Sequence, residues 1–156
     1  MQYRGEFIRK DGLVIPNNVT LYGAQRILRL AVTQIETEFW MALVDAAPDT
    51  ELQIEDMTEP TIGTNGYARQ AIERTTVGWP VVSQLNGEAF VETREFVFAA
   101  DGGDFDQEVS RIAFVESETA TDGDVIALSS AFPAKILITP ATILADRTFK
   151  YRLYGR

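Results

Sequence analysis

The segment Trp79–Ala100, WPVVSQLNGEAFVETREFVFAA, decides the fold class of this 156-residue chain. Its Asn86-Gly87 dipeptide stands between two runs rich in β-branched and aromatic residues, and it is one of the strongest short signals for a β-hairpin. In the second run, Phe90, Phe96 and Phe98 have the spacing of side chains on one face of a strand. The segment therefore predicts antiparallel β-structure.

Further runs of strand length lie on both sides of this hairpin. Residues 38–46 form an unbroken apolar run, which suits a strand covered on both faces, and residues 148–154 alternate in character. The other segments with strand character are residues 3–8, 13–16, 67–76, 109–115, 125–128 and 136–138. About seven to nine short strands separated by turn residues predict a mainly β fold, an antiparallel β-sandwich or a jelly-roll-like barrel.

The periodicity changes only near the N-terminus. Apolar residues from Leu21 to Ile35 recur at helical spacing, which predicts one amphipathic helix over about residues 21–34, with Asn17–Thr20 supplying cap candidates. We expect this helix to pack over an open end or edge of the sheet. Residues 1–16 are predicted to form an extended arm and residues 17–156 a single domain, so deleting residues 1–14 is expected to leave the domain folded and to impair assembly.

The composition excludes several kinds of chemistry. The chain has no Cys and no His, so it cannot use Ser–His–Asp or Cys–His catalysis or hold zinc through imidazole or thiolate. With 14 Lys and Arg against 23 Asp and Glu, the net charge of −9 argues against nucleic acid as a partner. The sequence shows no standard export signal and no long apolar run, so we expect no membrane segment.

Carboxylates are the main reactive groups that remain. The best cation candidates are in two Gly-containing loops, and calcium prefers such oxygen ligands, but the spacing fails the EF-hand pattern and tight turns use the same residues. A pair of carboxylic acids can also catalyse glycoside hydrolysis. Most acids in this chain, however, lie in loops between the predicted strands, as is typical of a solvated surface. We predict no enzymatic activity and no cofactor. The weak metal candidates are Asp101, Asp104, Asp106, Asp122 and Asp124.

The charges are unevenly distributed. Residues 45–59 carry six acids and no base, whereas the chain from Lys135 onward carries five bases and one acid. Acidic loops and a basic end favour contacts between copies of the chain or with an acidic surface, and a mixed, well-solvated surface is the alternative. The candidate interface residues are Tyr3, Arg4, Phe7, Arg9, Tyr67, Arg69, Arg147, Lys150, Arg152 and Arg156.

The order of several short motifs resembles a known group of proteins. LYGAQRILRLA (21–31) and FWMALVDAAP (39–48) are followed by Gly66-Tyr67-Ala68-Arg69-Gln70, by REFVFAADGGDF (94–105) and by Ile112-Ala113-Phe114-Val115. A Gly-Asp turn and a closing aromatic strand complete the series. Over roughly residues 17–154, this arrangement resembles the small virion structural proteins of tailed bacteriophages.

The resemblance implies a non-enzymatic, β-rich building block, made in the host cytoplasm and located on the virion. The first expectation is a capsid decoration (cement) protein that forms a dimer or trimer and clamps adjacent major capsid subunits, without contacting nucleic acid or a membrane. The second is a tail or baseplate component that anchors a fibre or meets a host surface. The third is a calcium-dependent or carbohydrate-binding module that uses the Asp101–Asp124 loops.

Three residues of the shared segment have predicted roles. Gly66 permits a turn that other residues disfavour, and Tyr67 lays its ring on the core and keeps its hydroxyl at the rim. Arg69 is expected to pair with an acid on a neighbouring strand or on another subunit. The alternative for all of them is that they maintain the local fold.

Overall fold

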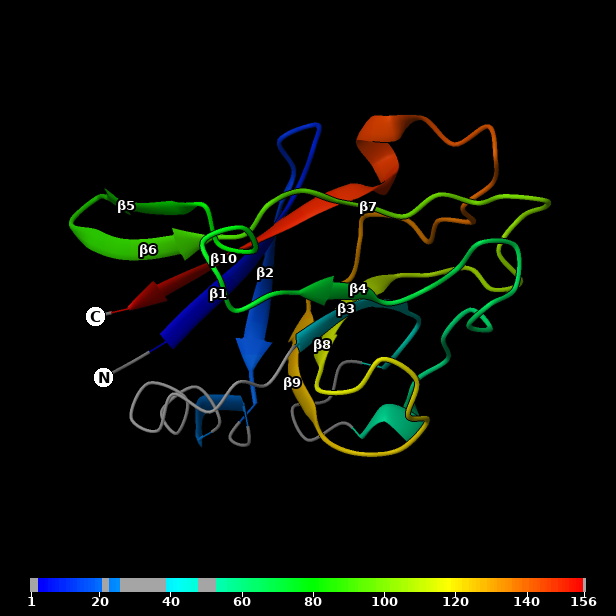
Figure 1. The fold of residues 1–156 in the computed structure, drawn as a ribbon, viewed down its shortest axis with the longest axis horizontal. Coiled ribbons are helices and arrows are strands. Elements are labelled where there is room, and N and C mark those ends of the chain that lie inside the picture. The colour runs from blue at the N-terminus through cyan, green and yellow to red at the C-terminus, as the bar shows by residue number, and fades with distance from the viewer. Residues whose placement is uncertain (1–2, 21–22, 26–38, 48–52, 156) are drawn as a thin grey trace.

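The computed structural model describes residues 3–20, 23–25, 39–47 and 53–155, and over these residues the protein is mainly β (Figure 1). The strands join into one 10-stranded antiparallel sheet that curls into a half-barrel. Two short 3-10 turns lie at Ile54–Asp56 (η1) and Leu144–Arg147 (η2). The strands are β1 (Tyr3–Arg9), β2 (Val14–Val19), β3 (Phe39–Val44), β4 (Gln70–Ile72), β5 (Val81–Leu85), β6 (Glu88–Glu92), β7 (Phe96–Val97), β8 (Arg111–Val115), β9 (Val125–Ser129) and β10 (Thr148–Gly155).

The sheet has two unpaired ends. Its order is β4-β3-β8-β9-β2-β1-β10-β6-β5, with β7 also paired to β10, so β4 and β5 are the end strands. The mainly β, antiparallel prediction is confirmed. The described strands form one sheet, however, and not the two facing sheets of a sandwich.

The core lies where the sheet is covered on both sides. β3 has only one residue that is not buried, and every residue of β9 is buried, as the apolar run at residues 38–46 predicted. Alternate residues of β3 enter two different clusters: Met41 and Leu43 join the large aromatic core, and Ala42 and Val44 a smaller cluster with Ile54. Curling of the sheet therefore lets a single layer bury both of its faces around β3, β8 and β9.

The predicted N-terminal arm is wrong for the residues that the structure describes. β1 lies between β2 and β10, and its partners run from Tyr3 opposite Gly155 to Arg9 opposite Phe149. Phe7 is 0% exposed and its ring lies 4.9 Å from that of Tyr151. The alternation that suggested an extended segment is the alternation of a central strand, so residues 3–9 belong to the core.

The prediction that Phe90, Phe96 and Phe98 lie on one face of a strand is also wrong. Arg152 lies opposite Glu92 and Phe149 opposite Phe96, so three steps along β10 correspond to four steps from β6 to β7. The additional residue is accommodated around Thr93, whose hydroxyl oxygen accepts the Tyr151 amide at 2.8 Å. This bulge reverses the alternation, because one extra residue moves the following side chains to the other face. Phe90 accordingly packs on Tyr154 on one face, while Phe96 and Phe98 enter the core on the other.

The predicted helix lies mostly outside the described residues. Residues 23–25 are helical, and Thr20 caps this turn because its hydroxyl oxygen accepts the Gly23 amide at 2.9 Å. Gly23 is required there, since a Cβ would lie 2.0 Å from the Ile126 carbonyl oxygen. Within the part of the chain that is described, we find no helix long and apolar enough to cross a membrane.

Two predicted strands are shorter than expected. The segment 67–76 contributes only Gln70–Ile72 to the sheet, and of residues 136–138 only Ile136 forms a bridge, with Val109. Backbone hydrogen bonds from Ile136 to Val109 and from Phe105 to Ile138 hold the second segment in place.

Candidate functional site

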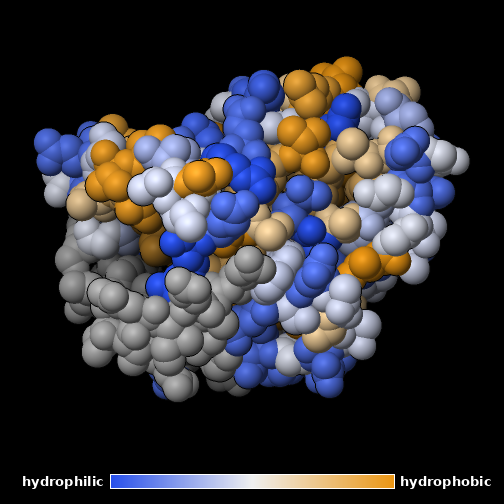
Figure 2. All heavy atoms as spheres, in the orientation of Figure 1, coloured by the Kyte–Doolittle hydropathy of each residue, from blue (hydrophilic) through white to orange (hydrophobic). Residues whose placement is uncertain are grey.

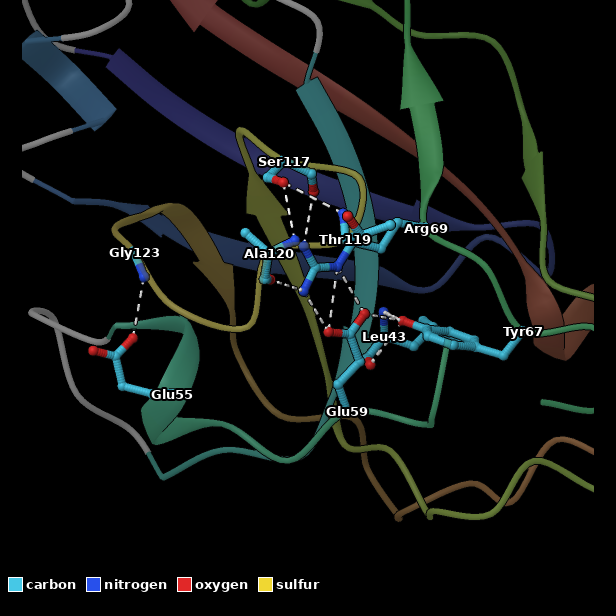
Figure 3. Close-up of polar contacts among 9 residues, drawn as sticks. All are labelled: Leu43, Glu55, Glu59, Tyr67, Arg69, Ser117, Thr119, Ala120 and Gly123. Atoms are coloured by element: carbon cyan, nitrogen blue, oxygen red, sulfur yellow. Dashed lines mark hydrogen bonds and ion pairs between the residues drawn. The ribbon is translucent and has the colours of Figure 1, made fainter. Parts of the chain in front are cut away.

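The Gly66–Gln70 segment contributes to a buried ion pair. Arg69 has a side chain only 1% exposed, and its Nε and Nη2 donate to the Glu59 carboxylate at 2.9 and 2.7 Å (Figure 3). Its other donors reach the carbonyl oxygens of Ser117 at 2.7 Å and Ala120 at 2.9 Å. The guanidinium therefore joins the segment before β4 to the loop after β8, and its charge and hydrogen bonds are satisfied inside one chain.

Tyr67 completes this buried group. Its hydroxyl donates to Glu59 at 2.6 Å and accepts the Leu43 amide at 3.1 Å, and its ring packs on Phe105 at 5.1 Å (Figure 3). Burial, together with the nearby Glu59 charge, raises the pKa of Tyr67 well above its ordinary value. Gly66 has a φ of +81°, as its predicted turn requires. The Tyr67 ring lies in the core, but its hydroxyl does not lie at the rim as predicted, because it is buried between Glu59 and the Leu43 amide. Arg69 pairs with an acid of the same chain.

The five aspartates proposed as weak cation candidates do not meet. Asp106 accepts the Thr61 amide at 2.9 Å, and the Asp104 carbonyl accepts the Asn65 side chain at 2.5 Å, so this loop is joined to residues 61–65. The Asp101 amide donates to Asn65 as well. Hydrogen bonds from the side chain and backbone of Thr61 lower the pKa of Asp106. These are the contacts of a turn.

The second acidic loop contacts a different segment. The Gly123 amide donates to Glu55 at 3.1 Å (Figure 3). Asp124 accepts the Gln53 side chain at 2.6 Å, and Asp122 is exposed. Gly123 has a φ of +113°, which explains glycine in this turn. Among the residues whose positions are described, no group of three or more His, Cys, Asp or Glu is placed to hold a metal ion.

A polar cleft of about 640 Å³ opens beside the end of β3. Asp45 accepts the Ser110 hydroxyl and the Lys135 ammonium, each at 2.5 Å. These two partners lower the pKa of Asp45, and the same hydrogen bond raises the pKa of Lys135. The amine stays protonated and the carboxylate stays ionised, so neither group is poised as a base or nucleophile near neutral pH.

An apolar groove of about 580 Å³ lies on the inner side of the sheet. Trp79, Val91 and Leu153 line it, and the Trp79 ring meets that of Tyr151 edge-on at 6.2 Å. Trp79 is partly buried and packs against the main core. Core packing therefore accounts for this tryptophan.

Several basic interface candidates instead belong to a network on the outer face of β1, β10 and β6. Arg152 donates to Glu92 at 2.5 Å and to Glu6 at 3.1 Å, and Lys150 donates to Glu92 at 2.7 Å. Arg4 pairs with Glu88 at 2.8 Å. Burial would raise the pKa of Glu92, but the hydrogen bonds from Lys150 and Arg152 outweigh it and hold that pKa below its ordinary value.

The remaining interface candidates are also occupied within the chain or lie outside its described part. Phe7, Tyr67 and Arg69 are 0%, 1% and 5% exposed, so an interface role for them is wrong because they lie in the protein interior. Arg9 pairs with Asp11 at 2.6 Å. Arg147 donates to the Thr142 and Phe98 carbonyl oxygens. The Tyr3 side chain and Arg156 lie outside the described part.

Sequence reasoning missed the most exposed apolar element, the hairpin of β5 and β6. All five residues of β5 are exposed, with Val81 at 36%, Val82 at 80% and Leu85 at 47%. The hairpin projects from the sheet, and Figure 2 shows apolar side chains gathered over this end of the molecule. The available signal was the uncharged VVSQL run, which is too apolar for an ordinary exposed strand.

A second exposed apolar surface lies at the start of η2. Ile143 is 64% exposed and the adjacent Leu144 is 45% exposed. η2 and the β5–β6 hairpin lie in different parts of the molecule, and Figure 2 has apolar atoms in both regions. We call these the hairpin surface (Val81, Val82 and Leu85) and the η2 surface (Ile143 and Leu144).

Comparison with protein-family models, with curated proteins and with solved structures gave no match.

Proposed function

We propose that this chain is a structural protein of a bacteriophage virion, and that it acts as a capsid decoration (cement) protein. The motif resemblance supports the virion assignment. The presence of two separate exposed apolar surfaces supports a role in adhesion, because exposed apolar patches mark interaction sites.

The separation of the two surfaces is the observation that carries this proposal. A cement protein must contact at least two neighbours at once, and the hairpin surface and the η2 surface offer contacts at different ends of one rigid β-domain. Neither contact has to be strong. When many copies bind one lattice, linked weak contacts give a high overall affinity.

The charged groups fit this role. Most basic side chains described above are paired with acids inside the chain, where they stabilise the sheet. Apolar side chains at an interface contribute about 25 cal/mol per Å² of area removed from water. We infer that burial of the hairpin and η2 surfaces, and not a bulk charge interaction, drives docking.

The test is binding to capsids that lack the protein. Ile143→Lys is expected to reduce occupancy at least tenfold, because it places a charge in the η2 surface. Val77→Lys is the matched control, since Val77 and Ile143 are both 64% exposed and Val77 belongs to neither surface. Equal binding by both variants, with unchanged melting temperatures, would contradict the proposal.

Copy number separates the head from the tail. A decoration protein is expected at hundreds of copies in a purified virion, and quantitative mass spectrometry would measure this. A dozen copies or fewer would favour the alternative, a tail or baseplate component.

A further inference from the structure

We propose that β5 is a self-association edge, and that it pairs antiparallel with β5 of a second copy about a two-fold axis at Ser83. The inference rests on the proposed function, because it names the partner of the hairpin surface. It is carried by the backbone geometry of the hairpin.

The two ends of the sheet differ in protection. At the β4 end, Arg94 donates to the Ala71 carbonyl at 3.3 Å, and β4 is only three residues long. β5 has five residues, all exposed, and among the described strands it pairs only with β6. It contains no lysine, no proline and no β-bulge, the features that usually prevent an edge strand from pairing with another chain.

The turn fixes which backbone groups of β5 face outward. Asn86 and Gly87 have φ values of +51° and +80°, the signature of a two-residue type I′ turn. Such a turn is closed by a hydrogen-bonded pair, here Leu85 opposite Glu88. Because hydrogen bonding to a neighbouring strand alternates from residue to residue, the backbone amides and carbonyls of Ser83 and Val81 also point toward β6. The amides and carbonyls of Val82 and Gln84 therefore face the open edge.

The register with Ser83 on the axis pairs the two outward-facing residues with each other. With Ser83 on the axis, Val82 of each copy lies opposite Gln84 of the other, which forms about four hydrogen bonds. An axis at Val82 would place Gln84 opposite Pro80, which has no amide proton to donate. The Ser83 register also places Val81 opposite Leu85 of the other copy, and this pair is apolar on both sides.

Charge does not oppose the approach. β5 has no charged residue, and the acids of the neighbouring strand are paired: Glu88 with Arg4, and Glu92 with Lys150 and Arg152. Like charges placed opposite each other would destabilise a two-stranded pair, and this edge brings none together. A five-residue strand is small beside a standard interface of about 20–30 residues a side, so we expect a weak dimer in solution.

A disulfide can trap this dimer, because the chain has no native cysteine. In the proposed register the two Ser83 Cα atoms form a non-hydrogen-bonded pair about 4.5 Å apart, within the range for a disulfide. Two Gln84 Cα atoms would be diagonal neighbours about 7–8 Å apart, which is too far. Ser83→Cys is expected to form an intermolecular disulfide at least tenfold faster than Gln84→Cys under the same mild oxidant.

Equal rates for the two cysteine variants, or no dimer from either, would overturn the inference. A second pair of variants tests the hydrogen bonds in the Ser83→Cys background. Val82→Pro removes an outward amide without touching the bonds to β6 and is expected to abolish cross-linking, whereas Val82→Thr keeps the amide and cross-linking. Thermal melts of both variants verify that the fold is retained.

The two proposals can fail separately. If Ser83→Cys fails to cross-link but Ile143→Lys still reduces capsid binding, the virion role stands and the hairpin partner is wrong. If the disulfide forms but the chain is missing from purified virions, self-association stands and the virion role is wrong.

Discussion

The Glu59–Tyr67–Arg69 group is the feature on which single residues have most effect. Arg69 is almost completely buried, and Glu59 is its ionic partner among the described residues. Removing one member of a buried ion pair leaves an uncompensated charge in the interior, which costs about 3–5 kcal/mol.

We therefore expect Glu59→Gln to lower the free energy of unfolding by about 3–5 kcal/mol, measured by urea denaturation. Tyr67→Phe keeps the ion pair and should cost about 1–3 kcal/mol, because it removes a hydroxyl from a buried network. Glu118→Gln, at an exposed position, is the control and should change stability by less than about 0.5 kcal/mol. A Glu59→Gln protein as stable as the control would refute the structural role of the pair.

Glu92 gives the protein a specific dependence on pH. Its pKa is lower in the folded chain than the ordinary 4.5, so it stabilises the fold above the unfolded pKa, and this contribution is lost as the pH falls through the folded value. We expect Glu92→Gln to destabilise the protein at pH 7 and to differ less from the unmodified protein at pH 3. Urea denaturation at both pH values measures this, and a gap that widens in acid would contradict it.

At the scale of elements, the strands at the two ends of the described chain depend on each other. β1 and β10 pair over seven residues, from Tyr3 opposite Gly155 to Arg9 opposite Phe149. The same pairing carries Phe7 and Tyr151 into the core. An element in the middle of a sheet cannot be removed as a peripheral arm can.

Deletion of residues 1–14 is accordingly expected to unfold the protein, in contrast to the expectation from sequence. It removes β1, the strand between β2 and β10, and exposes the core around Phe7. Loss of near-ultraviolet circular dichroism would report the unfolding. A truncated chain that still melts cooperatively would show that β2 and β10 can close the gap.

At the scale of the whole molecule, the sequence predicted those features that depend on residues close together in the chain. The Asn86-Gly87 hairpin and the doubly buried strand at residues 39–44 follow from local chemistry and composition. The bulge at Thr93 was not predictable, because it depends on how Tyr151 meets it from a distant strand. Likewise, Arg69 was expected to pair with an acid, but only the fold identifies that acid as Glu59 and shows that β5 is left without an outer partner.

The position of β10 between β1 and β6 has a consequence for biosynthesis. The ribosome makes β1 first among these strands, yet the strand that must lie beside it is completed only at residue 155. Until then β1 and β6 each present an unpaired hydrogen-bonding edge to the surroundings of the ribosome. Nascent chains should therefore be most vulnerable to aggregation and most dependent on chaperones late in translation, and protection should come in one step when the closing strand emerges.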